Sequence, residues 1–419
     1  MDADYPIRFA KHLAKKVLHR PDSVWAFYDF EQHLHPETLA RHDEILSWAE
    51  ERSAHKDLLE SEERYAHSTD PIVRQGYALK KRVEAAFRNK RAGTSGIRLL
   101  IQVPDPLVSP AGYSLFSNFV ESFEFIGISV RALAAGDSTR EALETFRPTF
   151  FLSIDSAVLL PMIDWDALAE YRKRHDLFIG LNAILEEEEV GNPPLLPRLD
   201  WASAHGVSFY FSFRDEEYVR SRKEYAPFFE RGYPILSLPF GANPLHHYPI
   251  PALERDLNFS ILASGTWKKG ASYALAGEAT ARYSGFIDGI GWRHARHFTF
   301  KKDRDRYIYA RSRMGFNFHL PEQIEWACEV NERTHQLAMC GLPQVLDAPK
   351  LLPKLYRADA VFACATEKEF TTAVERILAD PAYGERRALI AQREVFEKHT
   401  TFHRADAFIG QLERFLAKS

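Results

Sequence analysis

The sequence NERTHQLAMCGLPQV at residues 331–345 decides the fold that we expect for this chain. Short apolar runs of strand type lie before it, at residues 314–318, and at its end, at residues 343–346. Between them Leu337, Met339 and Cys340 recur at helical spacing, and Gly341 is suited to end a helix. Strand, loop, helix, glycine and strand in this order predict a βαβ unit, which binds ligands at the carboxyl ends of its strands.

The start of the predicted helix carries groups that bind anions. Asn331, Arg333 and Thr334 offer an amide, a guanidinium and a hydroxyl beside the free backbone N–H groups of a helix start. This is the chemistry that a phosphate group needs. The alternative is an ordinary crossover helix with an arginine on its surface. We therefore state the phosphate site as a hypothesis.

The same stretch resembles the donor-binding segment of GT-B glycosyltransferases of the CgeB-like (spore-coat glycosyltransferase-like, group 1) type. That segment consists of Arg, any residue, an aromatic residue, Glu, two residues, Ala or similar, Cys and Gly. Arg333, Cys340 and Gly341 match it in register. His335 replaces the aromatic residue, and Gln336 replaces the Glu that receives the ribose hydroxyls of a nucleotide-sugar. Gln still accepts a hydrogen bond but lacks the charge, so the departure bears on the identity of the donor.

Length and composition limit the class of protein. The chain has 419 residues, with 45% apolar and 13% aromatic residues, which predicts two or three globular domains. A net charge of −4 with dispersed basic residues argues against nucleic acid as a partner. Cys328, Cys340 and Cys364 have no paired spacing, which indicates a reducing compartment. With no signal peptide and no apolar run near membrane length, we expect a cytoplasmic protein.

Residues 1–96 have a helical pattern and little strand signal, with helices expected at about 7–18, 36–58 and 71–90. The helix at 7–18 is basic, so it suits either peripheral contact with the inner face of a membrane or packing onto the body of the protein. This block lies outside the family resemblance. We expect a helical N-terminal extension that serves acceptor recognition or assembly rather than the chemistry.

From residue 97 onward strands alternate with helices. Apolar runs at 97–103, 128–133, 149–154, 177–181, 207–211 and 235–238 predict a parallel sheet covered on both faces, with an acidic loop at 186–189. Asp105 and Asp155 lie just past strand ends, and Gly112 lies in the loop after the first strand, on the acceptor side. Turn and helix-cap roles remain open for both aspartates.

A second series of strands is expected at 257–263, 285–287, 314–318, 343–346 and 361–363, after a proline-containing junction at 238–244. The resemblance implies an α/β protein with two Rossmann-like domains facing each other across a cleft, which is the GT-B arrangement. The predicted boundaries are 1–96 for the helical extension, 97–245 for the acceptor domain, 246–400 for the donor domain and 401–419 for a C-terminal helix.

The resemblance and the strand ends together define the candidate site residues. The donor-binding set is Gly265, Lys268, Trp292, His319, Asn331, Arg333, Thr334 and Gln336. The catalytic candidates are Asp105, Asp155 and His319, with His205 as a further candidate base. An inverting transferase needs such a base to take the proton of the acceptor, whereas a retaining one does not. GT-B enzymes stabilise the leaving diphosphate without a bound metal, so we expect no metal and no other cofactor.

The function expected from these features is hexosyltransferase-like. A sugar moves from a nucleotide-diphosphate sugar to a surface glycan, a lipid-linked glycan or a protein. Two alternatives stay open. A nucleotide-sugar epimerase or hydrolase of the same fold would consume the donor without an acceptor. A non-catalytic sugar-binding or partner-binding protein is favoured by Gln336 in place of Glu.

Overall fold

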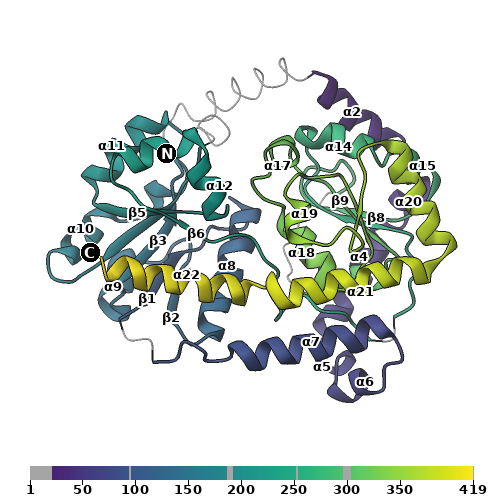
Figure 1. The fold of residues 1–419 in the computed structure, drawn as a ribbon, viewed down its shortest axis with the longest axis horizontal. Coiled ribbons are helices and arrows are strands. Elements are labelled where there is room, and N and C mark those ends of the chain that lie inside the picture. Colours follow the sequence, from purple (N-terminus) through teal and green to yellow (C-terminus); the bar gives the residue numbers. More distant parts are fainter. Residues whose placement is uncertain (1–20, 94–95, 186–191, 252, 296–302, 419) are drawn as a thin grey trace. The chain divides into compact units, whose positions relative to one another are not determined.

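The structure is a computed structural model that describes residues 21–93, 96–185, 192–251, 253–295 and 303–418. They form two compact units, each built on its own parallel sheet (Figure 1). The predicted basic helix at 7–18 and the predicted loop at 186–189 lie outside the described residues. None of the helices in the described ranges is long and apolar enough to cross a membrane.

The first unit comprises residues 87–240 and 401–418 of the described chain, and its strands have the order β2-β1-β3-β4-β5-β6. All of its strand pairs are parallel, and β3 is buried along its whole length, as expected for a sheet covered on both faces. Its strands are β1 (Arg98–Gln102), β2 (Ser129–Leu133), β3 (Phe150–Ile154), β4 (Phe178–Asn182), β5 (Val207–Ser212) and β6 (Ile235–Ser237). Its helices are α8 (Pro110–Phe125), α9 (Thr139–Phe146), η1 (Leu160–Met162), α10 (Trp165–Arg172), α11 (Leu195–Ala204), α12 (Glu216–Ser221), η2 (Lys223–Tyr225), α13 (Ala226–Glu230) and α22 (Thr401–Leu416).

The C-terminal helix α22 belongs to this first unit. Its amphipathic pattern places Phe408 in the core, 6.1 Å from the ring of Phe123 on α8. The hydroxyl of Ser122 on α8 donates to Thr401 at 2.6 Å. Residues 401–419 were predicted as a segment of their own. The apolar face of α22 instead completes the cover of the first sheet.

The second unit comprises residues 21–86 and 241–400, and its strands have the order β11-β10-β9-β7-β8, all parallel. Its strands are β7 (Ser260–Leu262), β8 (Phe286–Asp288), β9 (Gly315–Asn317), β10 (Gln344–Leu346) and β11 (Phe362–Ala363). Its N-terminal helices are α2 (Pro21–Gln32), α3 (Pro36–Ala40), α4 (His42–Ala54), α5 (Lys56–Leu59), α6 (Glu62–Ala66) and α7 (Pro71–Phe87). The others are η3 (Trp267–Lys269), α14 (Gly270–Ala274), α15 (Gly277–Arg282), α16 (Arg304–Arg311), α17 (Pro321–Trp326), α18 (Glu332–Met339), α19 (Leu352–Leu355), α20 (Glu367–Ala379) and α21 (Pro381–Lys398).

The unit β9–α18–β10 is the βαβ unit predicted from residues 314–346, and its two strands pair in parallel. Gly341 ends the helix with a φ of +72°, as its position after the last apolar residue predicts. A side chain at Gly341 would overlap Ile72 of α7, so the glycine also allows α7 to pack closely. The two series of strands therefore form two separate parallel sheets, as predicted.

The N-terminal helices are part of the core of the second unit. Phe27 and Phe30 on α2 are buried against Tyr273 and Trp292, with ring centroids 5.3–6.0 Å apart. The described part of residues 1–96 was predicted as a separate extension. Its apolar faces instead pack with residues of the second sheet and its helices, where they share two core clusters.

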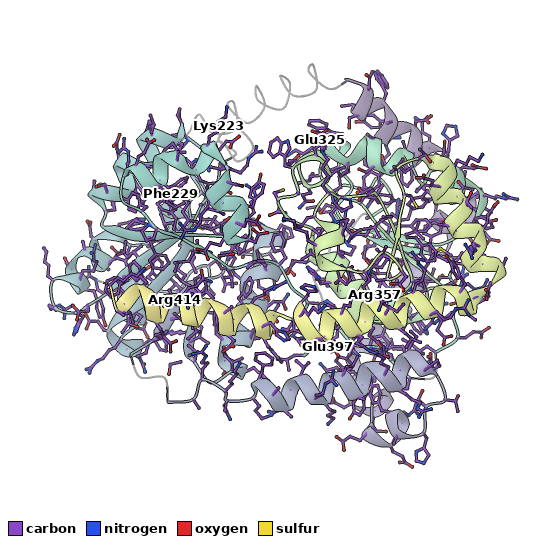
Figure 2. The ribbon with its side chains drawn as sticks, in the orientation of Figure 1. Lys223, Phe229, Glu325, Arg357, Glu397 and Arg414 are labelled. Atoms are coloured by element: carbon purple, nitrogen blue, oxygen red, sulfur yellow. The ribbon has the colours of Figure 1, made fainter. Side chains whose placement is uncertain are left out.

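Hydrogen bonds and an ion pair join α7 to α21 in the same unit. Gln75 donates to the carbonyl of Leu389 at 2.7 Å, and Gln392 donates to the carbonyl of Ile72 at 3.2 Å. Arg82 pairs with Glu397, which is labelled on α21 in Figure 2, at 2.9 Å. The amide of Gln392 is buried and that of Gln75 is half-buried, and each satisfies a backbone carbonyl of the other helix.

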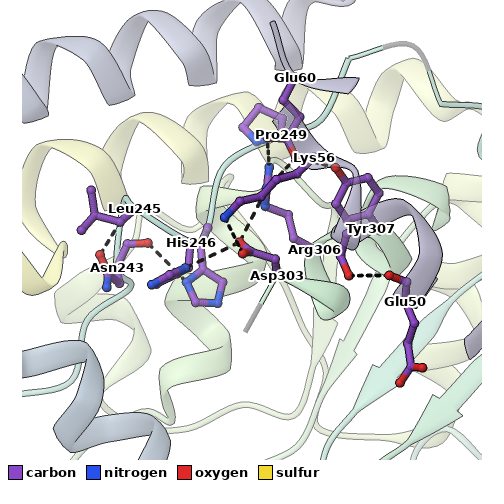
Figure 3. A network of polar contacts seen from close by, with 12 residues as sticks. Glu50, Lys56, Glu60, Asn243, Leu245, His246, Pro249, Asp303, Arg306 and Tyr307 are labelled. Atoms are coloured by element: carbon purple, nitrogen blue, oxygen red, sulfur yellow. Dashed lines mark hydrogen bonds and ion pairs between the residues drawn. The ribbon is translucent and has the colours of Figure 1, made fainter. Parts of the chain in front are cut away.

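A buried network joins the segment after α5 to α16 (Figure 3). Arg306 donates to both oxygens of Glu60 at 2.7 Å, and the Tyr307 hydroxyl donates to Glu60 at 2.6 Å. Lys56 and Asp303 form a second pair at 2.7 Å. Burial alone would raise the pKa of Glu60, but the charge and hydrogen bonds of Arg306 outweigh it and hold that pKa below its ordinary value. The bidentate geometry makes this the strongest type of contact between the N-terminal helices and the sheet domain.

Replacement of Glu60 by Gln should destabilise the second unit by about 3 kcal/mol, because it leaves the fully buried Arg306 without its main counter-charge. Urea unfolding followed by circular dichroism measures the change. The matched control is Glu62→Gln, since Glu62 pairs with Lys81 on the surface and should leave the unfolding midpoint unchanged. Equal stability of the Glu60→Gln variant and the parent would contradict this role for the network.

Candidate functional site

The candidate site lies at the carboxyl edge of the second sheet, where the loops after β7, β9 and β10 converge. These three strands are neighbours in the order β10-β9-β7, so the residues that follow them meet at one edge. Residues 263–269 follow β7, residues 318–320 follow β9, and Asp347 follows β10. The start of α18 completes the set.

His319 and Asp347 connect the ends of β9 and β10. The backbone N–H of His319 donates to Asp347 Oδ2 at 2.7 Å, and its ring Nδ1 lies 2.5 Å from Asp347 Oδ1. On the other side of the ring, Nε2 lies 3.1 Å from the hydroxyl of Thr334 on α18. Both His319 and Asp347 are buried. His319 therefore positions the start of α18 against the two strand ends.

The start of α18 is built as the sequence predicts. Asn331 is its N-cap, and its side-chain oxygen accepts from the backbone N–H of Thr334 at 3.2 Å. The amide nitrogen of Asn331 donates to the carbonyl of Phe318 at 3.0 Å. The side-chain nitrogen of Asn317 donates to the Thr334 hydroxyl at 2.9 Å. These bonds fix the orientation of the first turn of the helix.

Two cations lie next to this helix start, on different elements. Lys269, at the end of η3, donates from Nζ to the carbonyl of Phe318 at 2.8 Å. Arg333 donates from Nη1 to Asn317 Oδ1 at 3.4 Å, and its charge opposes the rise that burial causes in the pKa of Tyr309 on α16. Within the described part of the chain, neither cation is in an ion pair with a carboxylate. Their charges therefore remain available to an anion.

Burial and the nearby positive charge of Arg333 lower the pKa of Lys269 to about 7, although the carboxylates of Asp347 and Glu322 oppose the shift. A lysine with this pKa changes its charge near neutral pH. A bound anion would favour the charged form, so binding and protonation at Lys269 are coupled.

Four of the predicted donor residues occupy other positions near this edge. Trp292 is buried in the core, and its indole N–H donates to the carbonyl of Ala263 at 2.6 Å. Gly265 is required by this packing, because a Cβ there would lie 2.8 Å from the indole of Trp292. Lys268 is half-buried on η3, and Gln336 is half-buried one turn after Arg333 on α18.

Asp155 of the first unit has a buried partner. It follows β3 and is 1% exposed, and its Oδ2 accepts from Arg198 Nη1 at 2.6 Å. Arg198 also donates to the carbonyls of Pro193 and Ile184 at 3.1 and 2.7 Å. Burial raises the pKa of Asp155 to about 6, against the opposing effect of Arg198. A carboxyl group with a pKa near the working pH is suited to accept a proton.

Asp105, Gly112 and His205 have local contacts. Asp105 accepts from the backbone N–H of Leu107 at 2.7 Å, which is a turn role. Gly112 lies in the first turn of α8, and its N–H donates to the N-cap Ser109 at 3.3 Å. The ring Nδ1 of His205 lies 2.8 Å from the carbonyl of Trp201 on α11.

The structure thus brings together His319, Asn331, Arg333 and Thr334. It adds residues that the sequence reasoning did not single out. Lys269 is the neighbour of the predicted Lys268 on η3. It is the Lys269 side chain that reaches the carbonyl of Phe318. Asp347 follows an apolar strand, and that position could have identified it. Asn317 and Arg198 carry no local signal, because Asn317 meets Arg333 across 16 residues and Arg198 meets Asp155 across 43.

Among the residues that the structure describes, no group of three or more His, Cys, Asp or Glu side chains is arranged to hold a metal ion.

Comparison with known proteins agrees with this architecture. Residues 254–410 match a family model described as glycosyl transferase-like. Sucrose-phosphate synthase from Thermosynechococcus elongatus is similar in structure, with a TM-score of 0.50 and 12% identity, over 77% of this chain and 100% of that chain. T4 phage beta-glucosyltransferase has a TM-score of 0.50 and 7% identity, over 76% of this chain and 99% of that chain. No curated protein matches the chain.

The structural likenesses show the fold class that was predicted, α/β with two Rossmann-like sheets, and confirm it. The glycosyl transferase-like family model covers residues 254–410, which is less than half of the chain. The narrower CgeB-like type stays a prediction.

The raised pKa of Asp155 predicts how the stability of the first unit depends on pH. The folded-state pKa of about 6 lies above the ordinary 3.8, so this contribution is present below about pH 4 and is lost as pH rises through about 6. The parent should lose roughly 3 kcal/mol over this range from Asp155.

Asp155→Asn should remove this part of the pH dependence, measured by urea unfolding at a series of pH values. Asp166→Asn is the matched control, because Asp166 is exposed on α10 and its replacement should leave the parent's pH dependence in place. An Asp155→Asn variant with the parent's slope would show that Asp155 titrates normally.

Proposed function

We propose that this chain is a glycosyltransferase whose donor is a nucleoside-diphosphate sugar, and that the diphosphate binds at the start of α18. The observation that carries the proposal is the pair of cations, Lys269 and Arg333, bonded to the neutral oxygens of Phe318 and Asn317 beside a capped helix start. A diphosphate supplies the negative charge that this arrangement lacks.

The chemistry of transfer fits the same groups. When the bond between the anomeric carbon and the diphosphate breaks, negative charge grows on the departing phosphate oxygen. Arg333, Lys269 and the positive end of the helix dipole would stabilise that charge. The two cations are held by hydrogen bonds before a donor arrives, so little reorganisation is needed. We propose that this stabilisation operates without a metal ion.

Known structures support a nucleotide-sugar as the donor. A T4 phage glucosyltransferase structure, with a TM-score of 0.50 to this chain, holds UDP-glucose as its substrate. In the present chain Gln336 lies one turn beyond Arg333, so it would reach the sugar of the nucleotide. Its single acceptor suits either a uridine or a thymidine diphosphate sugar.

The acceptor chemistry is assigned to the first unit. We propose Asp155 as the group that accepts the proton of the acceptor hydroxyl in an inverting reaction, since burial holds its pKa near the working range. Asp105 is the weaker candidate because its carboxylate closes a turn. The acceptor would be a surface glycan, a lipid-linked glycan or a protein, reached from the cytoplasm.

Replacement of Arg333 by Ala tests the donor site. We expect UDP to bind more weakly by about 1.5–3 kcal/mol, the range for a hydrogen bond to a charged group. Isothermal titration calorimetry in EDTA measures it, and added Mg²⁺ should leave the parent's affinity unchanged. Arg282→Ala is the matched control, because Arg282 pairs with Glu375 on the surface. Unchanged UDP affinity in Arg333→Ala would place the site elsewhere.

Gln336→Glu distinguishes the two parts of this site. It should leave UDP affinity largely intact and shift preference toward ribonucleotides over dTDP, because a carboxylate accepts from two ribose hydroxyls.

The low pKa of Lys269 predicts how donor binding depends on pH. Its ammonium is charged below about pH 7, so the affinity for UDP-glucose should be highest there and fall as pH rises to about 8. UDP-glucose is the appropriate probe, because its diphosphate keeps the same charge over this range. Lys269→Met should bind weakly at every pH, and Lys269→Arg should bind without the decline. A parent affinity that does not change with pH would contradict this role of Lys269.

A further inference from the structure

A cavity of about 450 Å³ lies in the first unit, lined by residues of α10 and α11 and by Asp155, which follows β3. This volume falls within the range of about 300–1,000 Å³ that is typical of small-molecule sites. The lining residues that matter for its chemistry are Asp155, Leu160, Trp165, Arg198, Trp201 and His205. All of these residues belong to one unit, so the cavity is complete within it.

One wall of the cavity is aromatic. Trp165 and Trp201 meet edge to face, with ring centroids 4.8 Å apart and an interplanar angle of 85°. His205 stacks on Trp201 at 4.1 Å. The indole N–H of Trp165 donates to the carbonyl of Leu160 at 2.9 Å, which fixes that ring. Both tryptophans remain half-exposed, so they present apolar ring surface to the cavity.

The floor of the cavity is polar. Asp155 is 1% exposed and Arg198 is 5% exposed, and both line the cavity while they pair with each other. The guanidinium is already committed to Asp155 and to two backbone carbonyls. The carboxylate has further lone pairs and can accept from a ligand. Because the pair is neutral as a whole, it favours neither an anionic nor a cationic ligand.

His205 adds a second acceptor at the rim. Its Nδ1 lies against the carbonyl of Trp201, so in the neutral ring Nδ1 carries the hydrogen and Nε2 is an acceptor. Asp155 and His205 thus both offer acceptors in the cavity that the two tryptophans line. The ligand that fits is neutral, carries several hydroxyl donors and has an apolar face.

We propose that this cavity binds a sugar ring, with the C–H face of the ring on the indole surface that Trp165 and Trp201 leave exposed to the cavity and its hydroxyls donating to Asp155 and His205. A hydrocarbon or a simple aromatic group would fill the apolar part but leave the buried carboxylate without a donor in place of water. A sugar ring can cover the apolar part with its C–H face and donate to the carboxylate with its hydroxyls. On the basis of the proposed function, this sugar is a glycosyl unit of the acceptor, which narrows the acceptor class to a glycan or glycoconjugate.

The test is saturation-transfer-difference NMR on the full chain with methyl α- and β-glucopyranoside, galactopyranoside and mannopyranoside. At least one hexoside should receive saturation from the protein, most strongly at its ring C–H protons. Trp201→Leu and Trp165→Leu, made separately, should each raise the Kd for that hexoside by about tenfold. Trp25→Leu is the matched control, because Trp25 is an exposed tryptophan of the second unit, and it should bind as the parent does.

Thermal unfolding of each variant confirms that it folds, and two separate variants keep the test decisive if one of them does not. Absence of saturation transfer to every hexoside would overturn the inference. Equal transfer in the parent and in a folded tryptophan variant would also overturn it. So would binding of benzyl alcohol in place of the hexosides, which would indicate an apolar pocket without sugar recognition.

Titration of UDP into the same samples separates this inference from the proposed function. If the parent protein binds UDP but none of the hexosides, the sugar-binding role of the cavity is contradicted and the proposed donor site is not. Hexoside binding without UDP binding overturns the donor site, and with it the role of the sugar as an acceptor.

Discussion

The bonds between His319 and Asp347 are the constraint on which the proposed donor site depends. They join the ends of β9 and β10, and through Thr334 they orient the first turn of α18. The Asp347 carboxylate accepts from His319 and forms no ion pair with Lys269 or Arg333 in the described part of the chain, although its charge acts on Lys269 at longer range. Lys269 and Arg333 donate to uncharged oxygens, the carbonyl of Phe318 and the side-chain amide of Asn317, so their charges are available to a bound anion. This is electrostatic preorganisation in its simplest form, because the orientation is set during folding.

The N-terminal helices contribute to this arrangement through α16. Glu60 and Arg306 hold α16 against the N-terminal segment by a bidentate pair that is shielded from water. Tyr309, one turn later on α16, lies within electrostatic reach of Arg333. The surroundings of one cation of the candidate site thus include a helix that is held by residues more than two hundred positions earlier in the chain. A helical block outside the family match is for this reason part of the domain that carries the site.

The two units present different electrostatics at their candidate sites. The second unit offers positive charge and a helix start, which suits a diphosphate. The first unit offers a neutral carboxylate–guanidinium pair beside tryptophan rings, which suits an uncharged polyol. Under the proposed function this division matches the two substrates of a glycosyltransferase. The donor is charged and needs cations, whereas a glycan acceptor is neutral and needs hydroxyl acceptors and an apolar surface.

The sequence alone determined the strands, the two sheets and the start of α18. These features follow from local patterns, namely short apolar runs, the Asn331 cap and Gly341 at the helix end. Arg333 and Thr334 could be identified because they lie within that pattern.

Only the tertiary structure decided which distant side chains the buried charged residues contact. Arg198 meets Asp155 across 43 residues, and Arg306 meets Glu60 across 246. It also decided that Lys269 rather than Lys268 reaches Phe318 and that Trp292 is in the core. Side-chain direction and long-range pairing depend on packing of the whole domain, which periodicity does not encode.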